Sequence, residues 1–474
     1  MTSAKRRFPI SFSLIPMIFA LAGPTMLEQL MQTAVQYIDT AMVGTLGTTA
    51  TAAVGATTTV SWLVGSTINA VGIGFLAFIA QARGAGKHDL AKRAASQAVL
   101  GVVVLGVIFT VLSLALSGVI PVWMRVDESA RELSSKYFFV LYTTMLFRVA
   151  NIIFSTLLRA VGDTKTPMKV GIIVNIVNIV FNAILIYDPI TVTLFGASVK
   201  LPFAGMGVVG AALASAISYA VGGIIMTLVI YKHPEISPKG QSYKPCGEIL
   251  IPCMKIAIPN AIQRFGTSLG YVAFASIVNS LGEVSTAAHT IANTVESAFY
   301  IPGYGMQTAT ATLVGNAYGA KDGKKIRELS AAILFLEVGM MMASGGLLFA
   351  FAPDMVGIFS QDAAVIMLGA FVLRMVALSE PFYGVSIVLE GVMQGMGKTT
   401  FPLVINVIGM WAVRIVGTFI CVSILGMGLV SAWACMIAHN MMLFAAFLVY
   451  YLFGKWNPER EQPKPAVSEA SFSE

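Results

Sequence analysis

Four polar side chains in the first long apolar segment are spaced so that they share one face of a helix. Counting back from Asp39, glutamines recur at steps of three, four and three residues: Gln36, Gln32 and Gln29. Residues three or four apart are neighbours on a helix surface. A carboxylate removed from water favours its neutral form, so it binds a proton or Na⁺ readily. The stripe therefore predicts a cation site at Asp39; the alternative is a structural acid that only hydrogen-bonds to its neighbours.

A second polar stripe consists of asparagines in the apolar segment 168–188. Asn175, Asn178 and Asn182 follow one another at steps of three and four residues. Lipid offers such side chains no hydrogen-bond partners, so each stripe must face another helix or water. We expect both stripes to line a common interior. There, the amide carbonyls of Asn178 and Asn182 can complete an oxygen shell for Na⁺ at Asp39 or hydrogen-bond the protonated acid.

The composition predicts long helices that can position these stripes. The chain has 474 residues, of which 57% are hydrophobic and 11% charged, so it has too little polar surface for a soluble globular protein. Apolar stretches of about 20 residues or more recur, each long enough to cross a ~30 Å hydrocarbon layer as a helix. We predict an all-α polytopic membrane protein with twelve transmembrane helices, at 14–44, 52–80, 95–121, 133–158, 168–188, 205–231, 250–281, 286–314, 329–352, 364–393, 402–424 and 428–453.

Lysine and arginine between the spans orient the protein in the membrane. Most of them lie in the loops after spans 2, 4, 6 and 8, for example Arg83, Lys165, Lys239 and Lys324. The positive-inside rule then puts both termini in the cytoplasm, in a multi-pass protein of the cell inner (plasma) membrane. Because these cations sit in short loops, the net charge of +7 indicates topology and not a nucleic-acid partner.

An internal repeat divides the chain into two halves. One constant offset in residue number aligns Pro24 with Pro259, Gly47 with Gly282 and Gly162 with Gly397. Each half holds six spans, so both halves enter and leave the membrane on the same side. Parallel repeats of this kind are typical of secondary transporters with a site between the halves, although duplication can also build a larger bundle without transport.

The same division predicts five regions along the chain. They are a cytoplasmic N-terminus at 1–13, an N-lobe at 14–231, a cytoplasmic linker at 232–248, a C-lobe at 249–454 and a disordered cytoplasmic tail at 455–474.

The repeat also predicts that the two halves differ chemically. At the same offset Asp39 aligns with Phe274 and Asn182 with Gly417, so the carboxylate–amide set is expected in the first half only. The second half has charges of its own that can form ion pairs, snorkel to the interface or line a cavity: Arg264, Glu296, Glu337, Glu380, Glu390 and Arg414.

Several segments, in order along nearly the whole chain, resemble the multidrug and toxic compound extrusion (MATE) family. They are "LAGPTMLEQLMQTAVQYIDTAMVGTLG" (Leu21–Gly47), "LLRAVGDTKTPM" (Leu157–Met168), "GMGVVGAALAS" (Gly205–Ser215), "STAAHTIA" (Ser285–Ala292) and "LEGVMQGMGKTTFP" (Leu389–Pro402). The resemblance implies two parallel six-helix lobes in a V shape. It also implies export of organic, often cationic compounds in exchange for H⁺ or Na⁺.

The resemblance also assigns residues to the expected cation site. Asp39 matches the acid of the family's "DT" motif on the first helix, Asn178 and Asn182 match the amide positions on the fifth, and Ser215 falls where a hydroxyl often completes the site. Some members carry further acids on the seventh and tenth helices, where this chain has Thr267 and Tyr383. We expect the substrate cavity to be lined by Gln36, Gln32, Asn175, Glu296, Glu380 and Tyr383.

Two other functions fit parts of the pattern. A flippase for lipid-linked precursors would need a strongly cationic cavity, whereas the first-half stripes are mostly amides. An intramembrane aspartyl enzyme would need Asp163 and Asp188 to meet, but these residues are expected near opposite faces of the membrane. We therefore expect no enzyme activity.

The sequence also carries expectations about cofactors and partners. The four cysteines lack metal-site spacing, so we expect no cofactor other than the coupling ion, H⁺ or Na⁺, and no metal site other than Na⁺ at Asp39. The expected partners are small organic substrates and the lipid bilayer, and the protein is expected to act as a monomer.

Overall fold

Helices make up nearly all of the described chain. The computed structural model describes residues 12–194, 197–201, 203–454 and 456. The first half contains a 3₁₀ turn at Phe12–Leu14, α1 (Ile15–Gly44), α2 (Thr48–Gly84), α3 (His88–Leu116), α4 (Ile120–Trp123), α5 (Glu128–Tyr142), α6 (Met145–Ala160), α7 (Lys165–Ile186), β1 (Ile190–Leu194), β2 (Ala197–Leu201) and α8 (Gly207–Lys232). The second contains α9 (Gly247–Asn279), α10 (Glu283–Gly319), α11 (Gly323–Ala350), α12 (Ala352–Gly357), α13 (Ala363–Ala377), α14 (Glu380–Gly395), α15 (Thr400–Ile408), α16 (Val416–Phe419) and α17 (Leu429–Phe453).

These elements account for the twelve predicted spans. Eight helical segments are long and apolar enough to cross a membrane, and the bent pairs α5–α6 (53°) and α13–α14 (54°) bring the number to ten. The long helices α9 and α10, of 33 and 37 residues, are the other two, because the offset of the internal repeat aligns them with α1 and α2. The second bend has a clear cause, because Pro381 stands in the first turn of α14 and proline cannot continue a preceding helix.

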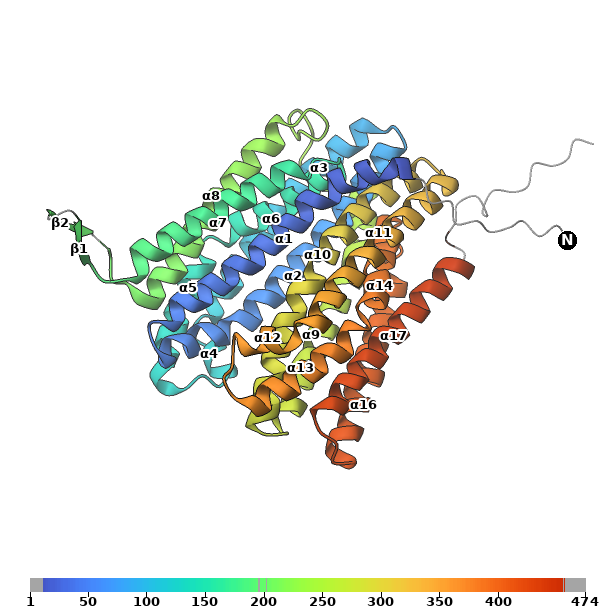
Figure 1. The fold of residues 1–474 in the computed structure, drawn as a ribbon. Helices are drawn as coiled ribbons and strands as arrows, with labels where there is room; N and C mark the ends of the chain where they lie inside the picture. Colours follow the sequence, from blue (N-terminus) through green and yellow to red (C-terminus); the bar gives the residue numbers. More distant parts are fainter. Residues whose placement is uncertain (1–11, 195–196, 202, 455, 457–474) are drawn as a thin grey trace, which may run out of the picture.

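One predicted span is irregular, and one loop is longer than its counterpart. The eleventh span is interrupted by π-helical segments at Gly409–Ile415 and Ile420–Ile424. The connection between α7 and α8 forms an antiparallel hairpin, in which Ile190 pairs with Leu201, and it projects beyond these two helices (Figure 1). The predicted N-terminus, 1–13, and the predicted tail, 455–474, lie almost wholly outside the described residues.

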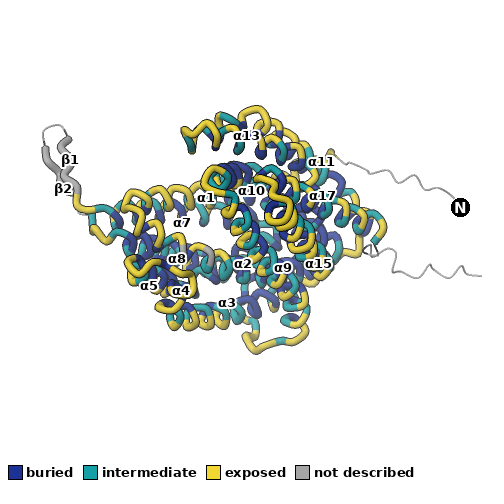
Figure 2. The backbone as a smooth tube through the Cα atoms, turned by 90° about the horizontal axis from the view of Figure 1, so that it is seen from below, coloured by how far each residue is buried: buried dark blue, intermediate teal, exposed yellow. Residues whose placement is uncertain are grey.

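The two halves lie side by side and meet along α1 and α2 of the first half and α9 and α10 of the second (Figure 2). Buried apolar residues fill each half, among them Phe138 and Phe154 in the first and Leu389 and Phe447 in the second. Many of the exposed residues are large and apolar, for example Val111 on α3 and Phe371 on α13, as a lipid-facing surface requires.

The halves make two matching close contacts where α2 and α10 end. A Cβ added at Gly84 would clash with the backbone of Asn316, and one added at Gly319 would clash with the backbone of Gln81. The offset of the internal repeat aligns Gly84 with Gly319 and Gln81 with Asn316, so the same contact is made twice across the interface. Only glycine allows the two helices to approach so closely.

Candidate functional site

The polar stripes of α1 and α7 meet around Asp39. Asn182 Nδ2 donates to Asp39 Oδ1 at 2.6 Å and to Asn178 Oδ1 at 3.2 Å. Asn178 Nδ2 lies 3.2 Å from Ser215 Oγ on α8. With the Asn178 amide turned over, its nitrogen would donate to Asp39 Oδ1 at 2.7 Å and its oxygen would accept from Ser215. The four residues predicted for a cation site therefore form one contiguous cluster, which we call the Asp39 cluster.

The Asp39 cluster has the chemistry of a cation site. Asn178 and Asn182 are 5% and 1% exposed, and Asn182 Oδ1 is buried without a hydrogen-bond partner among the described residues. None of the described ion pairs includes Asp39. A carboxylate beside an unused amide oxygen offers the oxygen ligands that hard cations prefer. The cluster can equally hold a proton on Asp39, because the neighbouring amide oxygens can accept its hydrogen bond.

The other predicted lining residues of the first half lie outside this cluster. Gln32 and Gln36 are exposed on α1, and Asn175 is buried on α7. Gln32 Nε2 lies 3.4 Å from Glu28 Oε1, so Gln32 contacts a different carboxylate.

Glu28 belongs to a buried ion pair that the sequence analysis missed. Arg159 Nη2 on α6 lies 2.7 Å from Glu28 Oε1, and the two side chains are 15% and 6% exposed. The Arg159 carbonyl also accepts from Thr312 on α10 at 3.1 Å, across the interface between the halves. The spacing could have revealed Glu28, because it precedes Asp39 by eleven residues and three helical turns bring both to one face.

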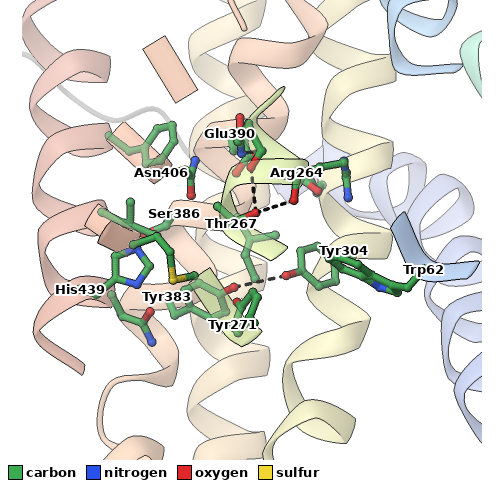
Figure 3. Close-up of a pocket in the computed structure, with 17 residues that line it drawn as sticks. Trp62, Arg264, Thr267, Tyr271, Tyr304, Tyr383, Ser386, Glu390, Asn406 and His439 are labelled. Atoms are coloured by element: carbon green, nitrogen blue, oxygen red, sulfur yellow. Dashed lines mark hydrogen bonds between the residues drawn. The ribbon is translucent and has the colours of Figure 1, made fainter. Parts of the chain in front are cut away.

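The second half encloses a polar cavity of about 110 Å³ (Figure 3). It lies among α9, α10, α14, α15 and α17, and Trp62 of α2 contributes one wall. Glu390 Oε1 accepts from Gln263 Nε2 at 2.9 Å and from Gln394 Nε2 at 3.1 Å. The hydroxyl groups of Tyr304 and Tyr383 are 3.3 Å apart.

Some of the charged residues of the second half line this cavity, and others lie elsewhere. Arg264, Glu390 and the predicted Tyr383 line it. Arg414 instead lies over the rings of Phe274 and Tyr271, 4.4 and 4.9 Å from their centroids. Such contacts stabilise a buried cation without a carboxylate partner.

The predicted lining residues Glu296 and Glu380 are not among the residues that surround this cavity. Glu296 is 5% exposed and Glu380 is 1% exposed. Within the described part of the chain, neither oxygen of Glu380 has a hydrogen-bond partner, and the same holds for Glu337 on α11. These acids are therefore packed inside the second half.

The fold and the paired halves define a class of protein: a polytopic helical membrane protein built from two parallel six-span repeats. The MatE family model matches residues 24–184 and 259–420. The two matches begin at Pro24 and Pro259, a pair that the internal repeat aligns. The chain thus belongs to the MatE family, a family of membrane transporters, and the resemblance inferred from its motifs is confirmed.

Individual relatives extend along nearly the whole chain. A probable multidrug resistance protein NorM of Thermotoga maritima is 29% identical over 95% of each chain. A probable multidrug resistance protein YoeA of Bacillus subtilis is 24% identical over 91% of this chain and 92% of its own. A solved structure described as the outward-facing conformation of a multidrug resistance MATE family transporter matches with a TM-score of 0.85, at 23% identity, over 94% of this chain and 95% of that one. This likeness confirms the twelve-helix fold.

Proposed function

We propose that the protein is a secondary active antiporter that exports small organic compounds in exchange for H⁺ or Na⁺. The observation that carries the proposal is the Asp39 cluster, in which a carboxylate outside all the described ion pairs lies against two buried amides, one of which contacts the Ser215 hydroxyl. The names of the relatives, which are multidrug resistance proteins, support drug-like compounds as the cargo.

The mechanism follows from linkage between two conformations. A cation at Asp39 favours one arrangement of α1 and α7, and the substrate favours the other, so each ligand drives release of the other. Inward movement of one charge down a 100 mV potential contributes about 2.3 kcal/mol. The paired glycine contacts at Gly84 and Gly319 hold the halves close together at this end, which supports it as the pivot of the rocking motion.

The orientation and organisation of the protein belong to the same proposal. The lobes are 14–231 and 249–454, joined by the linker 232–248, and the loops rich in lysine and arginine face the cytoplasm together with both termini. The protein acts as a monomer in the plasma membrane and needs no cofactor beyond the coupling ion.

A flippase for lipid-linked precursors is the second candidate, and the charge in the cavity argues against it. A pyrophosphate-bearing lipid would require several cations, whereas the described cavity is lined by one arginine, one glutamate and a group of tyrosines. This balance supports export of compounds with little or no net negative charge.

Counterflow in proteoliposomes tests the proposal. A Na⁺ gradient and a pH gradient, imposed separately, should show which ion drives uptake of a labelled aromatic cation by the wild-type protein. Asp39→Asn should abolish this uptake, and Glu283→Gln, at an exposed acid of α10, should not. Equal gradient-driven uptake by Asp39→Asn and wild type would refute the assignment.

A further inference from the structure

The internal repeat places equivalent residues at the same buried position in each half, which we call the node, and the chemistry of the two nodes differs. In the first half the node is the buried pair Glu28–Arg159. The offset of the repeat aligns Glu28 with Gln263 and Arg159 with Gln394. Both charges are thus replaced by neutral amides, and both amides donate to Glu390 Oε1. Glu390 itself aligns with Ser155.

The second-half node, unlike the first-half node, borders a cavity. Asn406 aligns with Gly171, where an added Cβ would lie 3.5 Å from the Glu28 side chain. The first-half node is therefore filled by its own ion pair, whereas Gln263, Glu390 and Asn406 all line the cavity. None of the described ion pairs includes Glu390. An ionised carboxylate in such a place is stabilised by amide donors but has no cation within ion-pair distance among the described residues.

Arg264 lines the same cavity but forms no described ion pair with Glu390. Within the described chain, the hydrogen bond found for the Arg264 guanidinium runs from Nε to Asn260 Oδ1 at 2.9 Å, which leaves its two terminal nitrogens for a ligand. No described ion pair joins Arg264 to Glu390, so the guanidinium nitrogens of Arg264 lie more than 4.0 Å from the carboxylate oxygens of Glu390. Arg264 aligns with Gln29, so this charge too is specific to the second half.

The remaining walls suit an aromatic ring with polar groups. Tyr271, Tyr304 and Tyr383 lie beneath the charged groups, and Trp62 stands on the Arg264 side (Figure 3). On the opposite side lies His439, which is 4% exposed and has no hydrogen-bond partner for either ring nitrogen among the described residues. A buried imidazole without a partner is costly, and it borders the cavity, so it can bind a polar group of the ligand.

We propose that this cavity is a binding site for compact zwitterionic aromatic compounds. The cationic nitrogen binds Glu390, the anionic group binds Arg264, and the ring packs among the tyrosines. A cavity of about 110 Å³ accommodates a group about one ring in size, below the ~300–1,000 Å³ of sites for drug-sized ligands. The inference rests on the proposed function for its role in export, but the binding itself can be measured separately.

The test is equilibrium binding to the purified full-length protein with a matched pair of labelled probes. The probes are 4-(aminomethyl)benzoate, which carries both charges, and its methyl ester, which carries only the ammonium group. Charge-assisted contacts contribute enough to change affinity about 10- to 100-fold. Wild type should therefore bind the zwitterion at least about 10-fold more tightly than the ester. Equal affinities would overturn the proposal without the need for any variant.

Variants then separate the two charged contacts. Glu390→Gln should weaken binding of both probes, and Arg264→Gln should weaken only the zwitterion and remove the preference for it. Arg374→Gln, at an exposed arginine of α13, is the control and should change neither. If Glu390→Gln altered the dependence of transport on the coupling ion and left both affinities unchanged, Glu390 would serve the ion, and the inference would be wrong.

Gradient-driven uptake distinguishes this inference from the proposed function. Asp39-dependent uptake of an aromatic cation without any zwitterion preference in binding would leave the function intact and refute the site. Selective zwitterion binding without any gradient-driven uptake would support the site and refute the antiporter.

Discussion

The two halves of the protein share a fold but divide their polar chemistry differently. The first half neutralises its internal node with the pair Glu28–Arg159 and places Asp39 among amides. The second half has Phe274 where the first has Asp39, and Phe274 packs under Arg414. Its node is a carboxylate held by amides beside a cavity. Duplication thus preserved the backbone contacts, such as those of Gly84 and Gly319, while the buried charges diverged.

The largest expected effect comes from breaking the cluster that exists in one half only. Asp39→Asn keeps the shape of the side chain but cannot be charged or carry the exchanged proton, so gradient-driven uptake should fall to the level of liposomes without protein. Substrate binding at equilibrium should persist, because the second-half cavity is intact. Loss of both activities together would mean that Asp39 is structural.

The ion pair that distinguishes the first-half node should matter for stability. Glu28→Gln leaves Arg159 buried and unpaired, and breaking a buried pair in this way costs about 3–5 kcal/mol. The double variant Glu28→Gln/Arg159→Gln copies the second half and should recover most of that loss. Thermal unfolding in detergent measures the loss of stability in the single variant and its recovery in the double variant. As a control, Glu132→Gln breaks an exposed pair with Lys136 and should change the melting temperature little.

Substitution of the glycine in either of the two matching contacts should lower the stability of the protein by the same amount. Gly84→Val and Gly319→Val each force a side chain against the backbone of the other half, and overpacking of this kind costs about 1–3 kcal/mol. Gly346→Val is the control, because a Cβ there meets nothing within 4 Å. A melting temperature lowered by only one of the two substitutions would show that the contacts are not equivalent in solution.

The smallest expected effect concerns Trp62, the residue of the first half that lines the second-half cavity. Trp62 is 50% exposed, so Trp62→Ala should leave the fold intact. Loss of one aromatic contact should raise the dissociation constant of an aromatic ligand about 2- to 10-fold. Trp411→Ala, outside the cavity lining, provides the comparison. An unchanged constant for Trp62→Ala would place the ligand away from the interface.

Local patterns in the chain predicted most of the fold and three residues of the Asp39 cluster, and the family resemblance supplied the fourth, Ser215. Long apolar segments specify the spans because lipid leaves helices as the practical way to satisfy the backbone. Asp39, Asn178 and Asn182 could be grouped because each stripe repeats at helical spacing and lipid excludes it from the outer surface. Pro381 marks the bend between α13 and α14 in the sequence, whereas the bend between α5 and α6 was not predicted.

The sequence by itself therefore determined the twelve spans, the repeat and the two polar stripes, because each is written in residues that are close in the chain or related by one fixed offset. The tertiary structure alone decided which distant charges meet. Glu28 and Arg159 are 131 residues apart, and Gln263 and Glu390 are 127 apart. Whether a buried charge gains an ion pair, an aromatic face or an amide depends on which helices pack together, and no local spacing encodes that choice.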